Sequence, residues 1–322
     1  MVEHLNIPFI VGAGSGAGNI LAKLTTEMKK IAINSSWKDL DMLPNDIIKV
    51  RAGEGFGSGM DPRRGERDYV KNGRKALREK IGEVLERAGL SWKNVSLVPV
   101  VISAGHGFGS GSGPRVVEDL KKWFPNIPVI AFVTHPFSWE GEEVQQKAWR
   151  CGIEVAKKTG TVIIDNDYVW KILGDVPITM ILGRANQYIS SMLDTFLRIA
   201  TSKTIMMGID MTDLRRVVEK GAVYMFTRSF KEGEPVSKIY DSDSTMCKLV
   251  KNMVEDLPTR IIAFIQSPKP PLPTLFDQLR RAAEEDLKVK VALFKTALFL
   301  GGDRLRISMV MGGLRWWWPG EE

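Results

Sequence analysis

Short apolar segments alternate with longer amphipathic segments over about the first 165 residues. The apolar segments end in glycine, proline or small polar residues, which is typical of buried strands. The segments between them carry apolar residues at helical spacing and predict helices. This alternation predicts a parallel sheet with helices on both faces, which binds ligands at the carboxyl ends of its strands. The predicted strands are residues 7–14, 31–36, 96–105, 127–135 and 161–167, and the predicted helices are residues 17–30, 63–88, 114–123 and 141–159.

A long helical segment and then a different pattern follow. Residues 185–202 have apolar positions at helical spacing and predict a helix that connects two domains. Beyond it, strands and helices are mixed, which indicates an α+β domain with a four-stranded sheet. The predicted strands here are residues 222–230, 260–268, 289–297 and 305–313, and the predicted helices are residues 211–220, 241–256 and 273–286. We therefore expect an α/β domain over residues 1–184, a central helix over 185–203, the second domain over 204–315 and a tryptophan-rich tail over 316–322.

The composition indicates a folded globular protein and excludes several classes. The 322 residues are 44% hydrophobic and 26% charged, which excludes a mainly disordered chain. No apolar run approaches the roughly 20 residues that span a bilayer, and the amino terminus has no basic leader, so we expect a cytoplasmic protein. Two cysteines exclude a disulfide framework, and three histidines show no metal-ligand spacing. Of these, Cys151 and Cys247 are expected to be buried thiols, and His135 is expected at the surface.

The net charge of +7 suggests a polyanionic partner, but its distribution narrows that suggestion. Residues 63–80 contain eight basic and three acidic residues. A stripe of basic residues lies at helical spacing here, opposite an apolar face of the same predicted helix. We expect the stripe to offset an acidic neighbour, a filament contact or a nucleotide, and we consider nucleic acid unlikely. The basic residues are Arg67, Lys71, Arg74, Lys75 and Arg78, and the apolar face is Val70, Leu77, Ile81, Val84 and Leu85.

The first candidate site is a glycine-rich turn at residues 12–19, between a predicted strand and a predicted helix. Glycines there let the backbone approach a phosphate, which the amides at the start of the helix then bind. Nicotinamide, flavin and nucleotide-hydrolysing enzymes share such a turn, and it can also be purely structural. A dinucleotide site would place a carboxylate about 20 residues on, but the second strand ends in Ile33, Asn34, Ser35 and Ser36.

Two further glycine-rich segments also follow predicted strands. Residues 105–113 alternate glycine with small residues before a helix expected to begin near Pro114, and they predict a loop of free amide donors. Residues 55–62 contain three glycines before Asp61 and Pro62. Three glycine-rich segments at different strand ends indicate a polyphosphate ligand.

These segments resemble the tubulin/FtsZ family. The match runs in family order over roughly residues 8–220, and the remaining length is similar to that of the family's C-terminal domain. The segments that resemble the family are GAGSGAGN at 12–19, GSGMDP at 57–62, GFGSGSG at 107–113, THPFSWEG at 134–141, IIDND at 163–167, Ala185-Asn186, GIDMTDLRRVV at 208–218 and LRISMVMGGL at 305–314.

The resemblance implies a site for GTP or GDP, with Mg²⁺ bound through the phosphates. Glu140 would bind the ribose and Asn186 the guanine, although a helix cap and a helix start are alternative explanations of these two residues. The resemblance also places Asn166 in the nucleotide site. The implied phosphate-binding residues are Ser15, Gly16, Ala17, Gly18, Asn19, Gly107, Phe108, Gly109, Ser110 and Gly111, with Gly57, Ser58 and Gly59 at the γ-phosphate.

The resemblance further implies that Asp210 and Asp213 are catalytic. They would enter the site of the next subunit in a head-to-tail protofilament and polarise the attacking water. Both are also explained by the start of a helix, where Asp210 would cap it and Asp213 would interact with its dipole. The implied partner is therefore the chain itself, with a cytoskeletal paralogue or a membrane adaptor as further candidates.

Several positions depart from the family pattern. Val144 replaces an arginine, Gly208 an asparagine, and Gln187 an aspartate found in many relatives. Trp316, Trp317 and Trp318 stand near the end of the chain, where the family has a long linker and an adaptor peptide. These departures favour a second hypothesis, a GTP-binding scaffold or regulator with little turnover. A nicotinamide-dependent oxidoreductase and a filament that moves DNA are remoter alternatives.

Overall fold

The structure is a computed structural model in which two compact units are distinguished. It describes residues 5–174, 176–201, 206–207, 209, 211–231, 234–236, 239, 260–271, 273–286 and 293–314. The first unit comprises residues 6–194, and the second comprises residues 195–322 together with 1–5.

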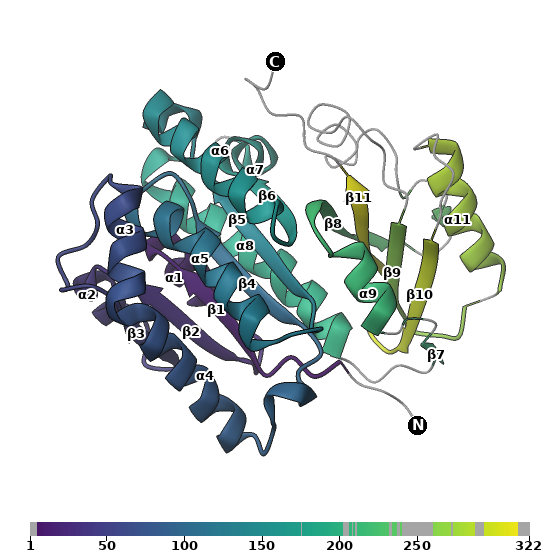
Figure 1. The fold of residues 1–322 in the computed structure, drawn as a ribbon. Coiled ribbons are helices and arrows are strands. Elements are labelled where there is room, and N and C mark those ends of the chain that lie inside the picture. The colour runs from purple at the N-terminus through teal and green to yellow at the C-terminus, as the bar shows by residue number, and fades with distance from the viewer. Residues whose placement is uncertain are drawn as a thin grey trace. The chain divides into compact units, whose positions relative to one another are not determined.

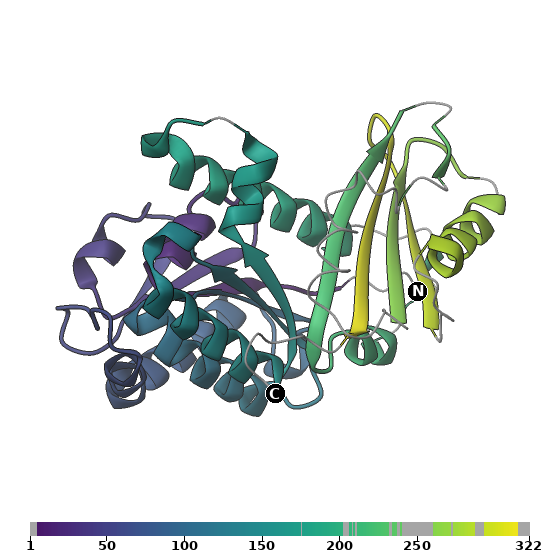
Figure 2. The same ribbon diagram turned by 90° about the horizontal axis from the view of Figure 1, so that it is seen from above.

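The first unit contains a six-stranded parallel sheet. The strands lie in the order β3-β2-β1-β4-β5-β6, and every neighbouring pair is parallel (Figure 1). Helices lie on both sides of this sheet (Figure 2), which confirms the predicted fold class. The strands are β1 (Phe9–Ala13), β2 (Lys29–Asn34), β3 (Ile47–Arg51), β4 (Val98–Ser103), β5 (Val129–His135) and β6 (Gly160–Asp165).

The two faces of this sheet bury different sets of side chains. Phe9 and Val11 of β1 pack with residues of α4, α5 and α6 in one core. Gly12, the next residue after Val11, faces the opposite side of the sheet and lies against Leu21 of α1. A Cβ added there would come within 2.7 Å of Leu21 Cδ1. The alternation follows from the two-residue period of a strand. The helices of this unit are α1 (Ser15–Leu21), α2 (Trp37–Asp41), α3 (Pro62–Asp68), α4 (Arg74–Arg87), α5 (Gly107–Trp123), α6 (Glu142–Ala156) and α7 (Asn166–Leu173).

The predicted segmentation is right for the long elements and wrong for three short ones. Strand β3 and helices α2 and α7 were not predicted, because each has eight residues or fewer and shows no sustained periodicity. Helix α1 ends at Leu21, well before residue 30, since β2 begins at Lys29.

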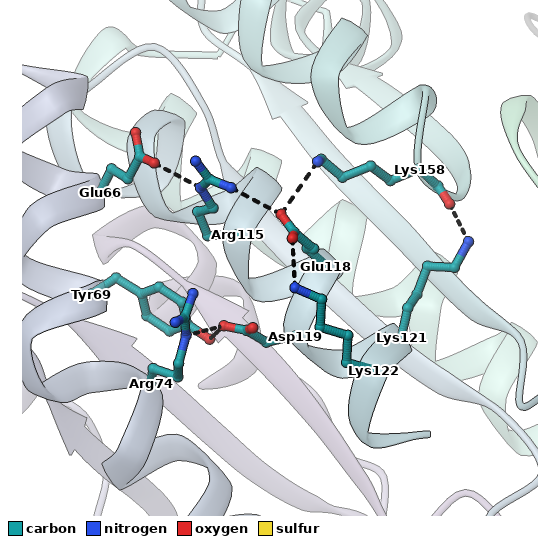
Figure 3. A network of polar contacts seen from close by, with 9 residues as sticks. All are labelled: Glu66, Tyr69, Arg74, Arg115, Glu118, Asp119, Lys121, Lys122 and Lys158. Carbon is teal, nitrogen blue, oxygen red and sulfur yellow. Dashed lines mark hydrogen bonds and ion pairs between the residues drawn. The ribbon is translucent and has the colours of Figure 1, made fainter. Parts of the chain in front are cut away.

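A π-helical turn, Tyr69–Gly73, connects α3 to α4. Such a turn places one extra residue in the helix, so the residues before it face a different direction from the one that regular helical spacing predicts. Val70 was predicted to be buried with Leu77, but it is exposed, and Tyr69 is buried instead. The Tyr69 hydroxyl donates to Asp119 Oδ2 at 2.9 Å, and Arg74 Nε donates to the same oxygen at 2.6 Å (Figure 3).

Helix α8 (Ile178–Thr201) begins seven residues before the predicted central helix. The division between the two units falls after Asp194, inside this helix. In the first unit, Asp194 accepts hydrogen bonds from the backbone amides of Thr25 and Thr26 at 2.7 and 3.0 Å. These bonds fix the helix to the chain between α1 and β2.

The second unit contains the four predicted strands and a short fifth strand, β7, that was not predicted. Its strands lie in the order β8-β11-β9-β10-β7, with β9 and β10 parallel and the other pairs antiparallel. The predicted helix at 241–256 and the tail at 316–322 lie outside the described residues. The elements are β7 (Met206–Met207), α9 (Met211–Val217), β8 (Gly221–Phe230), β9 (Arg260–Ser267), α11 (Thr274–Asp286), β10 (Leu293–Leu300) and β11 (Leu305–Leu314).

Among the described residues, every helix is too short or too polar to cross a membrane.

Candidate functional site

In the sheet of the first unit, the order in which strands are added reverses between β1 and β4. Strands β2 and β3 continue from β1 on one side, and β5 and β6 continue from β4 on the other. In such a sheet the loops after the two central strands diverge and leave space for a ligand at the carboxyl edge. The helices that follow these two strands are α1 and α5, and both begin in the glycine-rich segments identified in the sequence.

The turn between β1 and α1 is held by hydrogen bonds from three directions. Gly14, at φ 94°, donates its amide to Ile33 O at 3.0 Å. Ser15 Oγ donates to Asp39 Oδ2 at 2.5 Å and accepts from Asn34 Nδ2 at 2.9 Å. Ser15 and Asn19 are exposed, whereas Ala17 and Gly18 are buried. Asn34 therefore stands at the strand end, where the sequence lacks the dinucleotide carboxylate, and it holds the side chain of Ser15.

The second glycine-rich segment is the beginning of helix α5, not a loop. The helix starts at Gly107, seven residues before the predicted start at Pro114. The Gly107 amide donates to Gly59 O at 2.8 Å. The next amides, of Phe108 and Gly109, lie in the first turn and have no acceptor within the helix. The helix start therefore directs backbone donors and the positive end of its dipole toward the carboxyl edge.

Close packing explains why this helix begins with glycines. A Cβ at Gly109 would lie 1.8 Å from Ser103 O, and one at Gly111 would lie 1.8 Å from Pro62 O. A Cβ at Gly14 would lie 3.2 Å from Gly109 Cα. The starts of α1 and α5 are therefore in direct contact, and a side chain at any of these positions would separate the backbones.

The segment from Gly57 to Gly59 lies against the start of α5. Gly57 and Gly59 have φ of 76° and 56°, which favours glycine at both positions. Ser58 is buried between them, and its Oγ donates to Asp68 Oδ2 at 2.7 Å and lies 2.7 Å from Ser35 Oγ. Asp68 was not identified from the sequence, where it appeared only as one acidic residue of a basic helix.

Glu140 lies beside the start of α5. Its Oε2 is 3.8 Å from Nε2 of His106, the residue that precedes α5. Its Oε1 accepts a hydrogen bond from the Phe137 amide at 2.8 Å, so one oxygen has the capping role considered as an alternative. Ser138 donates its amide to Asp167 in the first turn of α7, at 3.0 Å to Oδ1. This bond brings the Glu140 segment to the helix that begins with Asn166.

Asn186 lies in α8, eight residues after the start of that helix, so the helix-start explanation is wrong. Ser190, one turn later, donates its hydroxyl to Ile20 O of α1 at 2.7 Å. Asn186 therefore lies on the face of α8 that passes α1. Burial raises the pKa of both Tyr168 and Tyr188. The hydroxyl of Tyr168 is buried and has no hydrogen-bond partner among the described residues. A polar group of a bound ligand would provide that partner.

His135 is not at the surface as predicted. It is the last residue of β5, it is 4% exposed, and its ring centroid lies 4.2 Å from that of Trp149. Burial lowers the pKa of His135 to about 4, against the opposing charge of Asp167. Cys151 is buried as predicted, and burial raises the pKa of its thiol to about 12.

The two predicted catalytic aspartates belong to the second unit. Asp210 lies outside the described residues, as do Gly208 and Cys247. Asp213 is the third residue of α9 and is 5% exposed. Its Oδ2 lies 3.2 Å from Nζ of Lys295 on β10. In this structure its carboxylate is therefore held within its own unit.

The residues collected at the carboxyl edge of the first unit suit a polyanion that also carries a hydrogen-bonding ring. The glycine-rich segments supply amides, Glu140 can accept from hydroxyl groups, and Asn186 can both donate and accept. The described residues contain no cluster of three or more His, Cys, Asp or Glu side chains arranged to hold a metal ion.

Comparison with known proteins agrees with this arrangement. The family model described as the Tubulin/FtsZ family, GTPase domain, matches residues 38–174. The chain is 26% identical over 234 residues to cell division protein FtsZ 1 of Archaeoglobus fulgidus, a match that covers 70% of this chain and 59% of that protein. It is 29% identical over 233 residues to FtsZ 1 of Thermococcus kodakarensis, covering 67% of this chain and 56% of that protein. The matched region thus spans less than three fifths of these relatives.

A solved structure resembles the chain over nearly its whole length. It is a GTPγS-bound protofilament of CetZ2 from Haloferax volcanii, with a TM-score of 0.74 and 18% identity, covering 96% of this chain and 93% of that one. At this identity the likeness concerns the fold.

Proposed function

Because the chain belongs to the tubulin/FtsZ superfamily, we propose that it binds GTP at the carboxyl edge of its first unit, assembles head to tail into protofilaments and hydrolyses GTP where two subunits meet. The start of α5 carries this proposal. Its first-turn amides lie against the start of α1, at the point where the strand order of the sheet reverses. Helix starts at such a point bind phosphate groups.

The proposed roles follow from where each residue lies. The segments 15–19 and 107–111 bind the α- and β-phosphates through backbone amides, and residues 57–59 close over the γ-phosphate. Glu140 binds the ribose, Asn186 binds the guanine edge, and Asn166 lies at the start of α7 beside them. Mg²⁺ is held through the phosphates, since the described protein side chains form no cage for it.

The surface around this edge supports association with another protein. Exposed large apolar side chains lie on the segments that follow β2, β3, β5 and β6. Several exposed large apolar side chains near a polar site are typical of a protein interface. The CetZ2 relative forms a protofilament with bound GTPγS. The exposed side chains are Met42, Phe56, Met60, Trp139 and Trp170.

Nucleotide binding is tested with a fluorescent GTP analogue. Asn186→Ala should weaken its binding about tenfold and reduce the preference for GTP over ATP, because a buried hydrogen bond to the base is lost. The control is Asn45→Ala, a change at an exposed residue distant from the site in sequence. Equal binding of GTP, ATP and NAD by the unaltered chain would contradict the guanine site and favour the nicotinamide alternative.

Hydrolysis is tested by measuring phosphate release as a function of protein concentration. A site completed by a second subunit predicts that the rate per subunit rises with concentration and then saturates. Asp213→Asn keeps the size of the side chain and should reduce the rate at least a hundredfold, whereas Asp277→Asn on the exposed face of α11 should not change it. A rate per subunit that is constant on dilution would show that one subunit suffices.

The ion pair of Asp213 with Lys295 favours a second candidate, a GTP-binding scaffold with little turnover. Val144 supports it, since this residue is buried beside Gly105 and cannot replace the charge of the family arginine. This candidate predicts filaments by electron microscopy with GTP and almost no phosphate release. The two candidates differ only in turnover, so assembly and hydrolysis measured on one preparation separate them.

A further inference from the structure

We propose that the groove between α3, α5 and α6 binds an extended acidic peptide segment of a partner protein. The groove has a volume of about 450 Å³ and is lined by residues of these three helices. Its floor is the early part of α5, where Ser110, Gly111 and Pro114 are small. Gly111 packs directly on the backbone of Pro62, so α3 and α5 meet along one side of this floor.

The lining of the groove holds more basic than acidic side chains, and the basic excess lies on the α6 wall, whereas the α3 wall also carries Asp61 and Glu66. Arg63 lines the α3 wall, and Lys147 and Arg150 line the α6 wall. Residues 147, 150, 151 and 154 have the spacing of a single helix face, so this wall is continuous along α6. Lys158 and Arg115 extend the cationic lining toward the far end of α5.

Most of these charges are already paired inside the protein. Arg115 donates to Glu66 at 2.6 Å and to Glu118 at 3.0 Å (Figure 3). Glu118 also accepts from Lys122 at 2.7 Å and lies 3.5 Å from Lys158 Nζ. Hydrogen bonds from Lys122 and Arg115 lower the pKa of Glu118 to about 2, so it remains ionised.

The carboxylates that line the groove are also engaged. Asp61 caps α3 and pairs with Arg67 at 3.7 Å, and Glu154 pairs with Lys157 at 3.0 Å. Lys147 pairs with Glu143 at 2.6 Å. Among the described residues, the guanidinium groups of Arg63 and Arg150 have no ion pair or hydrogen bond. The groove thus presents two uncompensated positive charges on opposite walls.

This arrangement fits carboxylates spaced along an extended chain. From residue 147 to residue 158 the helical rise is on the order of 16 Å, which about five residues of extended peptide span. Alternate side chains of such a peptide are roughly 7 Å apart, so its carboxylates can meet the arginines and avoid the carboxylates in the walls. A compact polyphosphate would place its charges beside those carboxylates as well.

The test uses a labelled octapeptide of alternating glutamate and alanine, with binding followed by fluorescence anisotropy. The double variant Arg63→Ala and Arg150→Ala should weaken binding about five- to twentyfold, from two partly exposed charge pairs. The control double variant, Arg64→Ala and Arg87→Ala, removes the same charge from exposed residues that do not line the groove and should bind as the unaltered chain does. Circular dichroism confirms that each variant is folded.

Four results would overturn the proposal: no binding of the octapeptide by the unaltered chain, no loss in the groove variant, an equal loss in the control variant, or tighter binding of inorganic tripolyphosphate than of the octapeptide. Saturating GDP should leave peptide binding unchanged, because the nucleotide is proposed to bind the backbone amides at the start of α5, whereas the peptide would contact side chains on α3 and α6. Displacement by GDP would instead assign the peptide to the nucleotide site. The inference therefore stands or falls independently of GTP hydrolysis.

Discussion

At the scale of single residues, His135 shows how burial changes an ionisable group. Its Nε2 is buried without a hydrogen-bond partner among the described residues, and burial lowers the pKa of His135 to about 4 from 6.5. The folded protein therefore disfavours the charged ring, while the unfolded chain binds a proton below pH 6.5. The contribution of His135 to stability is present at neutral pH and is lost progressively as the pH falls from 6.5 toward 4.

This residue gives a pH-dependent prediction. Between pH 7.5 and pH 5, His135 should account for about 2 kcal/mol of the fall in unfolding free energy. His135→Phe keeps an aromatic ring against Trp149 and should reduce the fall by that amount, measured by urea unfolding at each pH. His106→Gln, at an exposed histidine, serves as the control. Parallel pH profiles for His135→Phe and the unaltered chain would contradict the prediction.

At the scale of elements, α5 forms although its first seven residues include four glycines. Glycine disfavours a helix by about 1 kcal/mol relative to alanine, so close contacts with the strand ends and α3 must stabilise this one. Gly111→Ala places a Cβ 1.8 Å from Pro62 O, and we expect it to lower the unfolding free energy by about 2–3 kcal/mol.

A matched substitution separates packing from helix propensity. Gly183 lies in α8 and has no atom within 4 Å of an added Cβ, so Gly183→Ala should raise the unfolding free energy by up to about 1 kcal/mol. Thermal unfolding of both variants measures the difference. If both stabilise the protein, the glycines of α5 are not required for packing.

The basic residues from α3 to α4 show how ion pairs within the unit neutralise a charged helix face. The basic stripe predicted from residues 63–80 is largely paired within the first unit: Lys71 lies 2.7 Å from Glu54, and Arg74 lies 2.6 Å from the buried Asp119. Of the three explanations offered for the stripe, these ion pairs support the first for much of it: the basic residues offset acidic neighbours. Arg63 and Arg150, which line the groove beside α5, have no such partner among the described residues.

At the scale of the whole molecule, the exposed aromatic residues should serve assembly. Trp139 is 47% exposed, with its ring stacked 4.1 Å from Phe137 and in edge contact with Trp170 at 5.1 Å. Trp139→Ser should raise the concentration needed for assembly about tenfold or more, because tryptophans at interfaces contribute strongly to binding. Nucleotide affinity should remain unchanged.

Light scattering with GTP measures this effect, and Val70→Ser is the matched control. Val70 is 46% exposed but lies in the π-helical turn, which carries none of the exposed aromatic residues. If the Trp139 variant assembles at the same concentration as the unaltered chain, this edge is not part of the assembly interface.

The predictions from sequence succeeded where a local pattern is sufficient. The apolar strands, the alternation with helices and the second sheet were predicted, because runs such as residues 98–103 and 261–265 are apolar enough to be buried in almost any context. The glycine-rich segments were located correctly at strand ends. Their resemblance to a known family supplied the remaining roles, several of which stay predictions.

The tertiary structure decided what depends on contacts between distant segments. Helix α5 begins at Gly107 because Ser103, Pro62 and Gly59 pack against it, and helix propensity alone would place its start later. One extra residue in a π-helical turn buries Tyr69 and exposes Val70, a shift that periodicity cannot reveal. The sequence alone thus determined which segments are buried and where phosphate chemistry is possible, since hydrophobicity and glycine content are local. Which side chains meet, and which charges remain unpaired, depended on the packing of segments far apart in the chain.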